Sequence, residues 1–180
     1  LNYNGDIAVD VTVSDGELTD SDSFILTVNP VNDAPVLSDI NDQNMDEDGI
    51  FTYEIQATDI DGDAISYSIV IISGNASYDL VDTQLTVTPD LDWNGDVQVS
   101  VAVFDGELAD SDTFILTVNP VNDAPALIQS FENIDAEEDD SDIAIILSDY
   151  FIDIDSNEII YSASEDLSSI QLDIISDVLT

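Results

Sequence analysis

The chain repeats itself at an interval of 90 residues. Residues 1–35 align without gaps to residues 91–125, and 26 of these 35 positions are identical. Both copies end in the motif Asn-Pro-Val-Asn-Asp-Ala-Pro. Self-similarity at a fixed period indicates a tandem array, and a period of this length is enough for each repeat to be a small domain. The repeat therefore predicts modules joined by short, proline-bracketed linkers.

The period is out of phase with the ends of the sequence. The acidic motif at 59–63 returns more weakly at 153–157, an interval of 94 residues. We expect residues 1–30 to be the C-terminal half of one module, residues 31–120 to be a complete module, and residues 121–180 to be the N-terminal part of a third. A window with this phase is more typical of a long repetitive protein than of an isolated domain.

Alternating apolar residues predict strands in each repeat. Valine occupies every second position over 97–103, and apolar residues alternate again over 114–118. A period of two with β-branched residues is typical of half-buried strands. The Asp-Gly at 105–106 and the Asn-Gly at 94–95 predict turns between adjacent strands. Further strands are expected over 50–58, 65–72, 78–82 and 84–88. About seven strands per module suit a β-sandwich, and no segment shows a helical period.

Acidic residues carry all of the charge. The chain has 41 Asp and Glu, no Lys, Arg, His or Cys, and a net charge of −41. Since no side chain can neutralise a phosphate, nucleic acid and anionic membranes are excluded as partners. A His-activated nucleophile and a Cys/His zinc site are excluded because their residues are missing. Hydrophobic residues make up 44% of the chain, which indicates a folded core, and no apolar run is long enough for membrane insertion.

Oxygen ligands remain, and these suit hard cations such as Ca²⁺. Asp59, Asp61 and Asp63 alternate along one short turn, where Gly62 allows the backbone to curl and the carboxylates to converge. A solvated acidic turn has the same spacing, so the spacing alone leaves both interpretations open. Because the chain has no internal cation, repulsion among its carboxylates must be met by salt or divalent ions, which favours calcium.

Three motifs together resemble the bacterial cadherin-like repeats of large surface and secreted proteins. They are the linker Val-Asn-Asp-Ala-Pro, the segment Ala-Thr-Asp-Ile-Asp-Gly-Asp at 57–63, and Asp-Gly-Glu-Leu at 105–108. The resemblance covers essentially the whole chain. It implies an all-β fold of tandem immunoglobulin-like or cadherin-like β-sandwich modules of about 90 residues. It also implies calcium at the junctions between modules.

The same resemblance implies a set of calcium ligands. These are a Glu near the start of a module, an Asp-x-Asp pair, the Asn-Asp of the linker and an Asp in a later loop. Carried onto this sequence and joined by the third acid of the 59–63 turn, the candidates are Asn32, Asp33, Glu47, Asp59, Asp61, Asp63 and Asp105. In the second linker and the following module they are Asn122, Asp123, Glu137, Glu138, Asp153 and Asp155.

The leading hypothesis for function is a calcium-stiffened rod or filament on or outside a bacterial cell, built from neighbouring repeats or identical subunits placed head to tail. One alternative is a fibre whose subunits complete each other's sandwich, because residues 126–180 and 1–35 together amount to one module. No enzyme activity is expected. Paired carboxylates are the only catalytic groups available, and their motif recurs in every repeat.

A second alternative is a carbohydrate-binding module that takes cell-surface or matrix glycans as partners. Trp93 and Tyr3 share one position of the repeat and could stack on a sugar. An aromatic anchor packed against the edge of the core is the more expected role for this position. An extracellular or cell-surface location is expected for each of these hypotheses.

Overall fold

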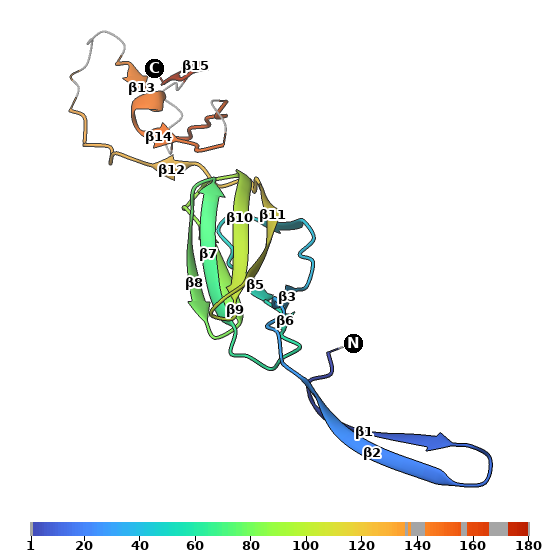
Figure 1. The fold of residues 1–180 in the computed structure, drawn as a ribbon. Helices are drawn as coiled ribbons and strands as arrows, with labels where there is room; N and C mark the ends of the chain where they lie inside the picture. Colours follow the sequence, from blue (N-terminus) through green and yellow to red (C-terminus); the bar gives the residue numbers. More distant parts are fainter. Residues whose placement is uncertain (1, 136, 138–142, 156–157, 166–172, 180) are drawn as a thin grey trace. The chain divides into compact units, whose positions relative to one another are not determined.

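The computed structural model describes all residues except 1, 136, 138–142, 156–157, 166–172 and 180. It divides the chain into two compact units, Leu1–Asn119 and Pro120–Thr180. Within the described residues every regular element is a strand, apart from one 3-10 turn (Figure 1). The prediction of an all-β fold is therefore confirmed, while the bounds expected for the three segments stay a prediction. No helix in the described part of the chain is long and apolar enough to cross a membrane.

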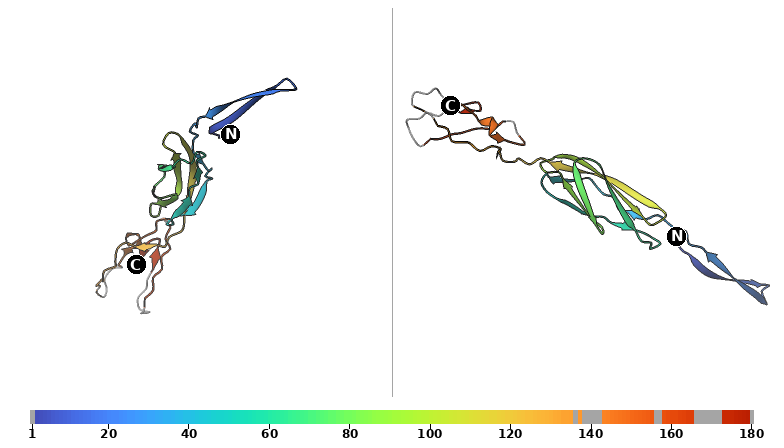
Figure 2. Two further views of the ribbon diagram at one scale, coloured as in Figure 1. Left: turned by 60° about the horizontal axis from the view of Figure 1, so that its bottom comes forward. Right: turned by 90° about the vertical axis from the view of Figure 1, so that its left-hand side faces the viewer.

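Two sheets face each other in residues 31–119 and form a sandwich (Figure 2). The first sheet has the strand order β4-β11-β10-β7. Its strands are β4 (Gln43–Asp46), β11 (Ala109–Asn119), β10 (Gly95–Phe104) and β7 (Ser66–Ser73). The second sheet consists of β5 (Phe51–Glu54), β9 (Gln84–Pro89) and β8 (Ala76–Val81), and the short strands β3 (Val36–Leu37) and β6 (Ala57–Thr58) pair separately. We call this sandwich the complete module.

Strands β10 and β11 form a long antiparallel hairpin in the middle of the first sheet, with Gly95 opposite Val118. The predicted Asp-Gly turn joins them, and Gly106 adopts a φ of 112°, which L side chains rarely take. The Asn-Gly at 94–95 behaves differently, because β9 and β10 belong to different sheets. The expectation that this turn joins adjacent strands was wrong: turn residues reverse the chain but do not determine which strands pair.

The core lies between the two sheets, where β10 faces β9. Val99, Val101 and the other inward valines of β10 are fully buried, as the period-two pattern predicts. Leu85 and Val87 on β9 belong to the same buried cluster. Trp93 is half-buried and packs against this cluster, which confirms its expected role as an anchor at the core edge.

Strands β1 (Gly5–Ser14) and β2 (Thr19–Val28) form a second antiparallel hairpin in the first unit. Its register repeats that of β10 and β11, with Gly5 opposite Val28. The two hairpins share most of their sequence, yet the apolar side chains of β1 and β2 are largely exposed. The backbone of this hairpin is therefore set by local sequence, whereas burial of its apolar face is not.

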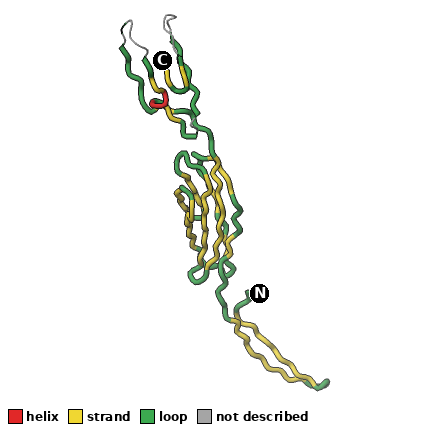
Figure 3. The backbone as a smooth tube through the Cα atoms, turned by 90° about the horizontal axis from the view of Figure 1, so that it is seen from above, coloured by secondary structure: helices red, strands yellow, loops and turns green. Residues whose placement is uncertain are grey.

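The second unit contains only two-residue strands within its described part. Strand β12 (Ala126–Leu127) pairs with β14 (Phe151–Ile152), and β16 (Val178–Leu179) lies between β13 (Ile145–Ile146) and β15 (Ile174–Ile175). The 3-10 turn η1 (Leu147–Asp149) precedes β14 (Figure 3). Its Leu147 side chain is buried. The rings of Phe131 and Tyr150 stack with their centroids 4.2 Å apart. This unit has a small apolar centre and little regular sheet.

Candidate metal centre

The acidic turn at 59–63 folds around one oxygen of Asp59. This Oδ1 accepts hydrogen bonds from the backbone amides of Asp61, Gly62 and Asp63 at 2.9, 2.9 and 3.1 Å. Gly62 adopts a φ of 85°, which allows the loop to close. As a result, carboxylate oxygens of Asp59, Asp61 and Asp63 lie within 4.8 Å of one another. The convergence expected from the spacing of these residues is present in the fold.

The second oxygen of Asp59 has no donor. Its Oδ2 is buried and has no hydrogen-bond partner among the residues that the structure describes. Burying a polar atom without a hydrogen-bond partner costs free energy, and the cost is larger when the group carries a charge. The chain has no Lys, Arg or His to supply a positive charge. A cation held between these carboxylates would satisfy the Asp59 oxygen, so the donor set fits a hard metal ion such as Ca²⁺.

The linker residues Asn32 and Asp33 are tied to this loop and to the later acid. The amide of Asp33 donates to Asp61 Oδ2 at 2.8 Å, and the Asn2 side chain donates to Asp33 Oδ2 at 2.8 Å. Asn32 Nδ2 donates to Asp105 Oδ2 at 3.0 Å. The predicted residues Asn32, Asp33, Asp59, Asp61, Asp63 and Asp105 are thus linked at one end of the complete module.

The turn that contains Asp105 stabilises the charged form of its carboxylate. The backbone amides of Leu108 and Glu107 both donate to its Oδ1 at 2.7 Å. These two hydrogen bonds, the one from Leu108 first, hold the pKa of Asp105 below the ordinary value of 3.8, with a smaller contribution from Asn32. Asp15 repeats this turn and its pKa is lowered for the same reason. A carboxylate that stays charged is suited to a cation site.

Glu47 lies at the other end of β11. Its amide donates to the carbonyl of Asn119, the last residue of that strand, at 2.9 Å. Its carboxylate is the buried acidic side chain of the complete module and accepts a hydrogen bond from Asn94 Nδ2 at 3.3 Å. Asp105 lies in the turn between β10 and β11, at the opposite end of β11 from Asn119, so Glu47 does not join the group around Asp59. The two ends of the module carry separate acidic groups.

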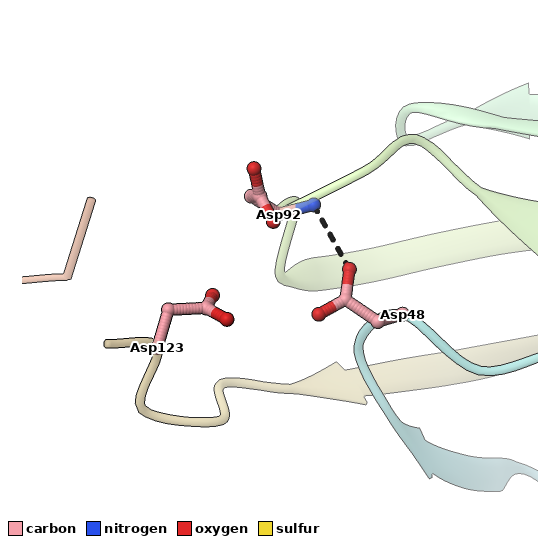
Figure 4. Close-up of side chains that lie close together, drawn as sticks. All are labelled: Asp48, Asp92 and Asp123. Carbon is pink, nitrogen blue, oxygen red and sulfur yellow. Dashed lines mark hydrogen bonds between the residues drawn. The ribbon is translucent and has the colours of Figure 1, made fainter. Parts of the chain in front are cut away.

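Sequence reasoning missed Asp48 and Asp92 beside Glu47. The amide of Asp92 donates to Asp48 Oδ1 at 3.2 Å (Figure 4). Both residues adopt positive φ values, 60° and 54°, which are uncommon for residues other than glycine. The segment Asp-Trp-Asn-Gly-Asp at 92–96, which corresponds to Asn-Tyr-Asn-Gly-Asp at 2–6, could have drawn attention to this position. Its Asn-Gly predicts a turn and its Trp93 an aromatic anchor, whereas Asp92 belongs to none of the predicted ligand motifs.

The second unit reproduces part of the first group. The amide of Asp123 donates to Asp155 Oδ2, and the amide of Asp155 donates to Asp153 Oδ1 at 3.0 Å. These bonds repeat the pattern of Asp33, Asp61 and Asp59. Asn122 instead donates to the carbonyl of Asp123 at 2.8 Å. Glu137 is exposed, and Glu138 lies outside the described residues.

The complete module matches a known family of protein domains. A family model described as a cadherin-like domain matches residues 31–119. Chitinase A of Pseudoalteromonas piscicida is 34% identical over 113 residues, which are 60% of this chain. The chain spans only 13% of the length of that chitinase.

Solved structures with a similar arrangement include a chimeric titin Z1Z2 and the surface layer protein SbsC, domains 4–9. The titin chimera is 12% identical with a TM-score of 0.39, over 83% of this chain and 80% of that chain. SbsC is 13% identical with a TM-score of 0.38, over 96% of this chain and 30% of that chain. Together with the sandwich and its acidic ends, the family match leads to one assignment: residues 31–119 are a cadherin-like domain.

Proposed function

We propose that this chain is a segment of an extracellular rod whose modules are stiffened by calcium. The observation that carries the proposal is the buried Oδ2 of Asp59, which lacks a partner in a loop where three carboxylates converge. Two oxygens that bind one Ca²⁺ at about 2.4 Å lie at most about 4.8 Å apart. The oxygens of Asp59, Asp61 and Asp63 meet this limit.

The linker would transmit the effect of the ion to the junction. The hydrogen bond from the Asp33 amide to Asp61 joins the linker directly to the acidic loop. Without calcium, the converging carboxylates repel one another. The linker is then held by the hydrogen bonds that Asn32 and Asp33 make. Bound calcium would neutralise the loop, fix the carboxylates that accept the linker amide, and so restrict bending at the junction.

A location outside the cell follows from the same chemistry. Few protein oxygens converge on the loop, and calcium modules of extracellular proteins bind with Kd values of about 10⁻⁴ to 10⁻³ M. Such a site fills only where calcium is abundant. The hydration of 41 carboxylates also suits a protein exposed to a saline medium.

A structural role is favoured over glycan binding or catalysis. The Trp93 ring is partly buried and packs against the core, which favours a structural role for this position. The relative named a chitinase matches over 13% of its length, so the match does not carry an activity to this chain. We propose that the cadherin-like domain is a non-catalytic spacer, with neighbouring repeats as its partners.

Small-angle scattering of the full chain with calcium and with EDTA, at matched ionic strength, tests the proposal. Calcium should narrow the range of conformations of the native chain. Asp59→Asn should abolish this response, because the amide keeps an acceptor for the loop but removes the charge. Asp79→Asn, an exposed carboxylate on β8, is the matched control and should respond like the native chain. Identical native profiles in calcium and EDTA would contradict the proposal.

A further inference from the structure

Strand β7 is an open edge of the first sheet of the complete module. It pairs with β10 on one side, and within the described residues no strand pairs with its other side. The register with β10 is regular from Ser66 to Ile71 and shifts only after Ile71, where the ladder contains a bulge. An open edge of this length offers a row of backbone donors and acceptors to another strand.

The edge strands of the two larger sheets of the complete module differ in charge. Strand β4 contains Asp46, β5 contains Glu54 and β8 contains Asp79. Strand β7 has no acid and lies within residues 64–78, the longest stretch of the chain without Asp or Glu. Charged side chains on an edge strand are a common means of preventing pairing with another chain. The β7 edge lacks this protection in a chain where 41 of 180 residues are acidic.

Neither the core nor the repeat accounts for this uncharged edge. Val70 and Ile72 are 53% and 52% exposed, so burial does not require an apolar residue at either position. At the 94-residue interval that relates the acidic motifs, Glu165 and Asp166 stand at the positions of Ile71 and Ile72. The absence of acids is therefore a feature of this strand, and it favours a contact made by the strand itself.

The register shows which backbone groups face the open edge. Residues of a central antiparallel strand bond alternately to the neighbour on one side and to the neighbour on the other. The Phe104 carbonyl accepts a hydrogen bond from Ser66 Oγ at 3.0 Å, and the Asp105 amide bonds to Leu108 across the β10–β11 turn, so Phe104 faces β7. The same alternation directs the amide and carbonyl groups of three β7 residues to the open edge: Tyr67, Ile69 and Ile71.

We infer that β7 pairs antiparallel with β7 of a second copy of this chain. Ile69 lies opposite Ile69 of the second copy, and Tyr67 lies opposite Ile71. This register pairs all three open residues of each strand, and it gives about six backbone hydrogen bonds because each such pair of residues exchanges two. The contact uses the same surface on both copies, so it closes as a dimer with twofold symmetry.

The charge of the chain favours a second copy over another partner. A basic protein would be attracted to the acids elsewhere on the surface, and a neutral strand adds nothing to that attraction. The absence of acids matters instead to a partner that is itself acidic, because it removes carboxylate repulsion at the contact. A second copy has a net charge of −41 and brings the same neutral strand to the contact.

This pairing is separate from the proposed calcium site. It uses none of the carboxylates of the 59–63 loop, so EDTA should leave it intact. Charges outside the contact repel at low ionic strength, and salt screens them over about 8–10 Å near 0.1 M. Association should therefore strengthen as salt is added, whether or not calcium is present.

Sedimentation velocity of the full chain in EDTA and moderate salt is the first test. We expect a concentration-dependent equilibrium between the 19.5 kDa chain and a dimer. Ser68→Asp adds an acid to the exposed face of β7 and should weaken association at least about tenfold, because the two copies of this acid repel each other. Ser111→Asp is the matched control, since it adds the same charge at an exposed serine of β11, an inner strand of the sheet. It should change association less than about twofold.

Cysteine cross-linking tests the register. The chain contains no Cys, so Ser68→Cys and Val70→Cys can be made in separate chains and mixed. In the inferred pair these two residues lie opposite each other at a position without hydrogen bonds, where Cα atoms are about 4.5 Å apart and within disulfide range. Oxidation should give a mixed disulfide between two chains, whereas Ser111→Cys should not link to Val70→Cys.

Three results would overturn the inference. The first is a chain that stays at 19.5 kDa at every concentration and salt condition. The second is association that Ser68→Asp and Ser111→Asp weaken equally, because the contact would then not involve the β7 edge. The third is a Val70→Cys chain that links to Ser111→Cys as readily as to Ser68→Cys, because β7 would then not pair with itself in this register.

Discussion

The paired phenylalanines Phe114 and Phe24 allow the energetics of the fold to be tested within one sequence. Both lie in the segment Asp-Ser-Asp-(Ser/Thr)-Phe-Ile-Leu, so their local propensities are nearly identical. Phe114 is buried against the rings of Phe51 and Tyr53, whereas Phe24 is more than half exposed. Removal of a buried Phe side chain costs about 3–5 kcal/mol, which includes the cavity that it leaves.

Urea denaturation of the two alanine variants, monitored by tryptophan fluorescence, is the assay. Trp93 is the one tryptophan and packs against the core of the complete module, so it reports the unfolding of that module. With a urea m-value of about 1–2 kcal/mol/M, a loss of about 3–5 kcal/mol means that Phe114→Ala should lower the midpoint by about 1.5–5 M or abolish the folded state. Phe24→Ala should change the midpoint by less than about 0.5 M. Equal shifts for the two variants would refute the reasoning, because they would require Phe24 to be part of the same core.

Three further predictions concern the complete module. Gly74→Ala should destabilise it more than Gly106→Ala in urea denaturation, because a Cβ at Gly74 would lie 2.8 Å from the carbonyl oxygen of Asp96 whereas the space at Gly106 is open, and both have positive φ; equal costs would contradict this. Asp112→Asn should lower the free energy of unfolding by about 1–3 kcal/mol in the same assay. Both carboxylate oxygens of Asp112 accept hydrogen bonds from backbone amides, and the NH₂ group of Asn would have to face one of these donors. Because the pKa of Asp105 is lowered by the backbone amides of its turn, its contribution to stability is present above the unfolded value of 3.8 and is lost as the pH falls through the folded pKa. Asp105→Asn should therefore reduce the loss of stability as the pH falls below 3.8, and an unchanged pH dependence would exclude this role.

The sequence pattern predicted strands and turns well because these depend on local features. Alternate valines over 97–103 form the inner face of β10, and the Asp-Gly at 105–106 turns the chain into β11. The 59–63 loop converges as its spacing and its glycine suggest. Each of these outcomes depends on a few neighbouring residues, so one repeat carries enough information to predict it.

The same pattern could not predict contacts between segments that are far apart in the sequence. The hairpins over 5–28 and 95–119 share their local sequence but differ in burial, since burial depends on whether a covering segment is present. Likewise, the residues near the Asn-Gly at 94–95 do not indicate that it connects strands of two different sheets. Asp48 and Asp92 were missed for this reason, because they become neighbours only when the chain crosses between the sheets.

Calcium binding to the full chain, measured by titration calorimetry at fixed ionic strength, tests the central claim most directly. The acidic loop around Asp59 should bind Ca²⁺ with a Kd of about 10⁻⁴ to 10⁻³ M. Free calcium at about ten to a hundred times the Kd should then raise the free energy of unfolding of the module by about 1–3 kcal/mol. Asp59→Asn should lose binding at this loop, while Asp79→Asn should retain it. A native chain that takes up no more calcium than Asp59→Asn would contradict the account, because its convergent carboxylates would then be a solvated surface.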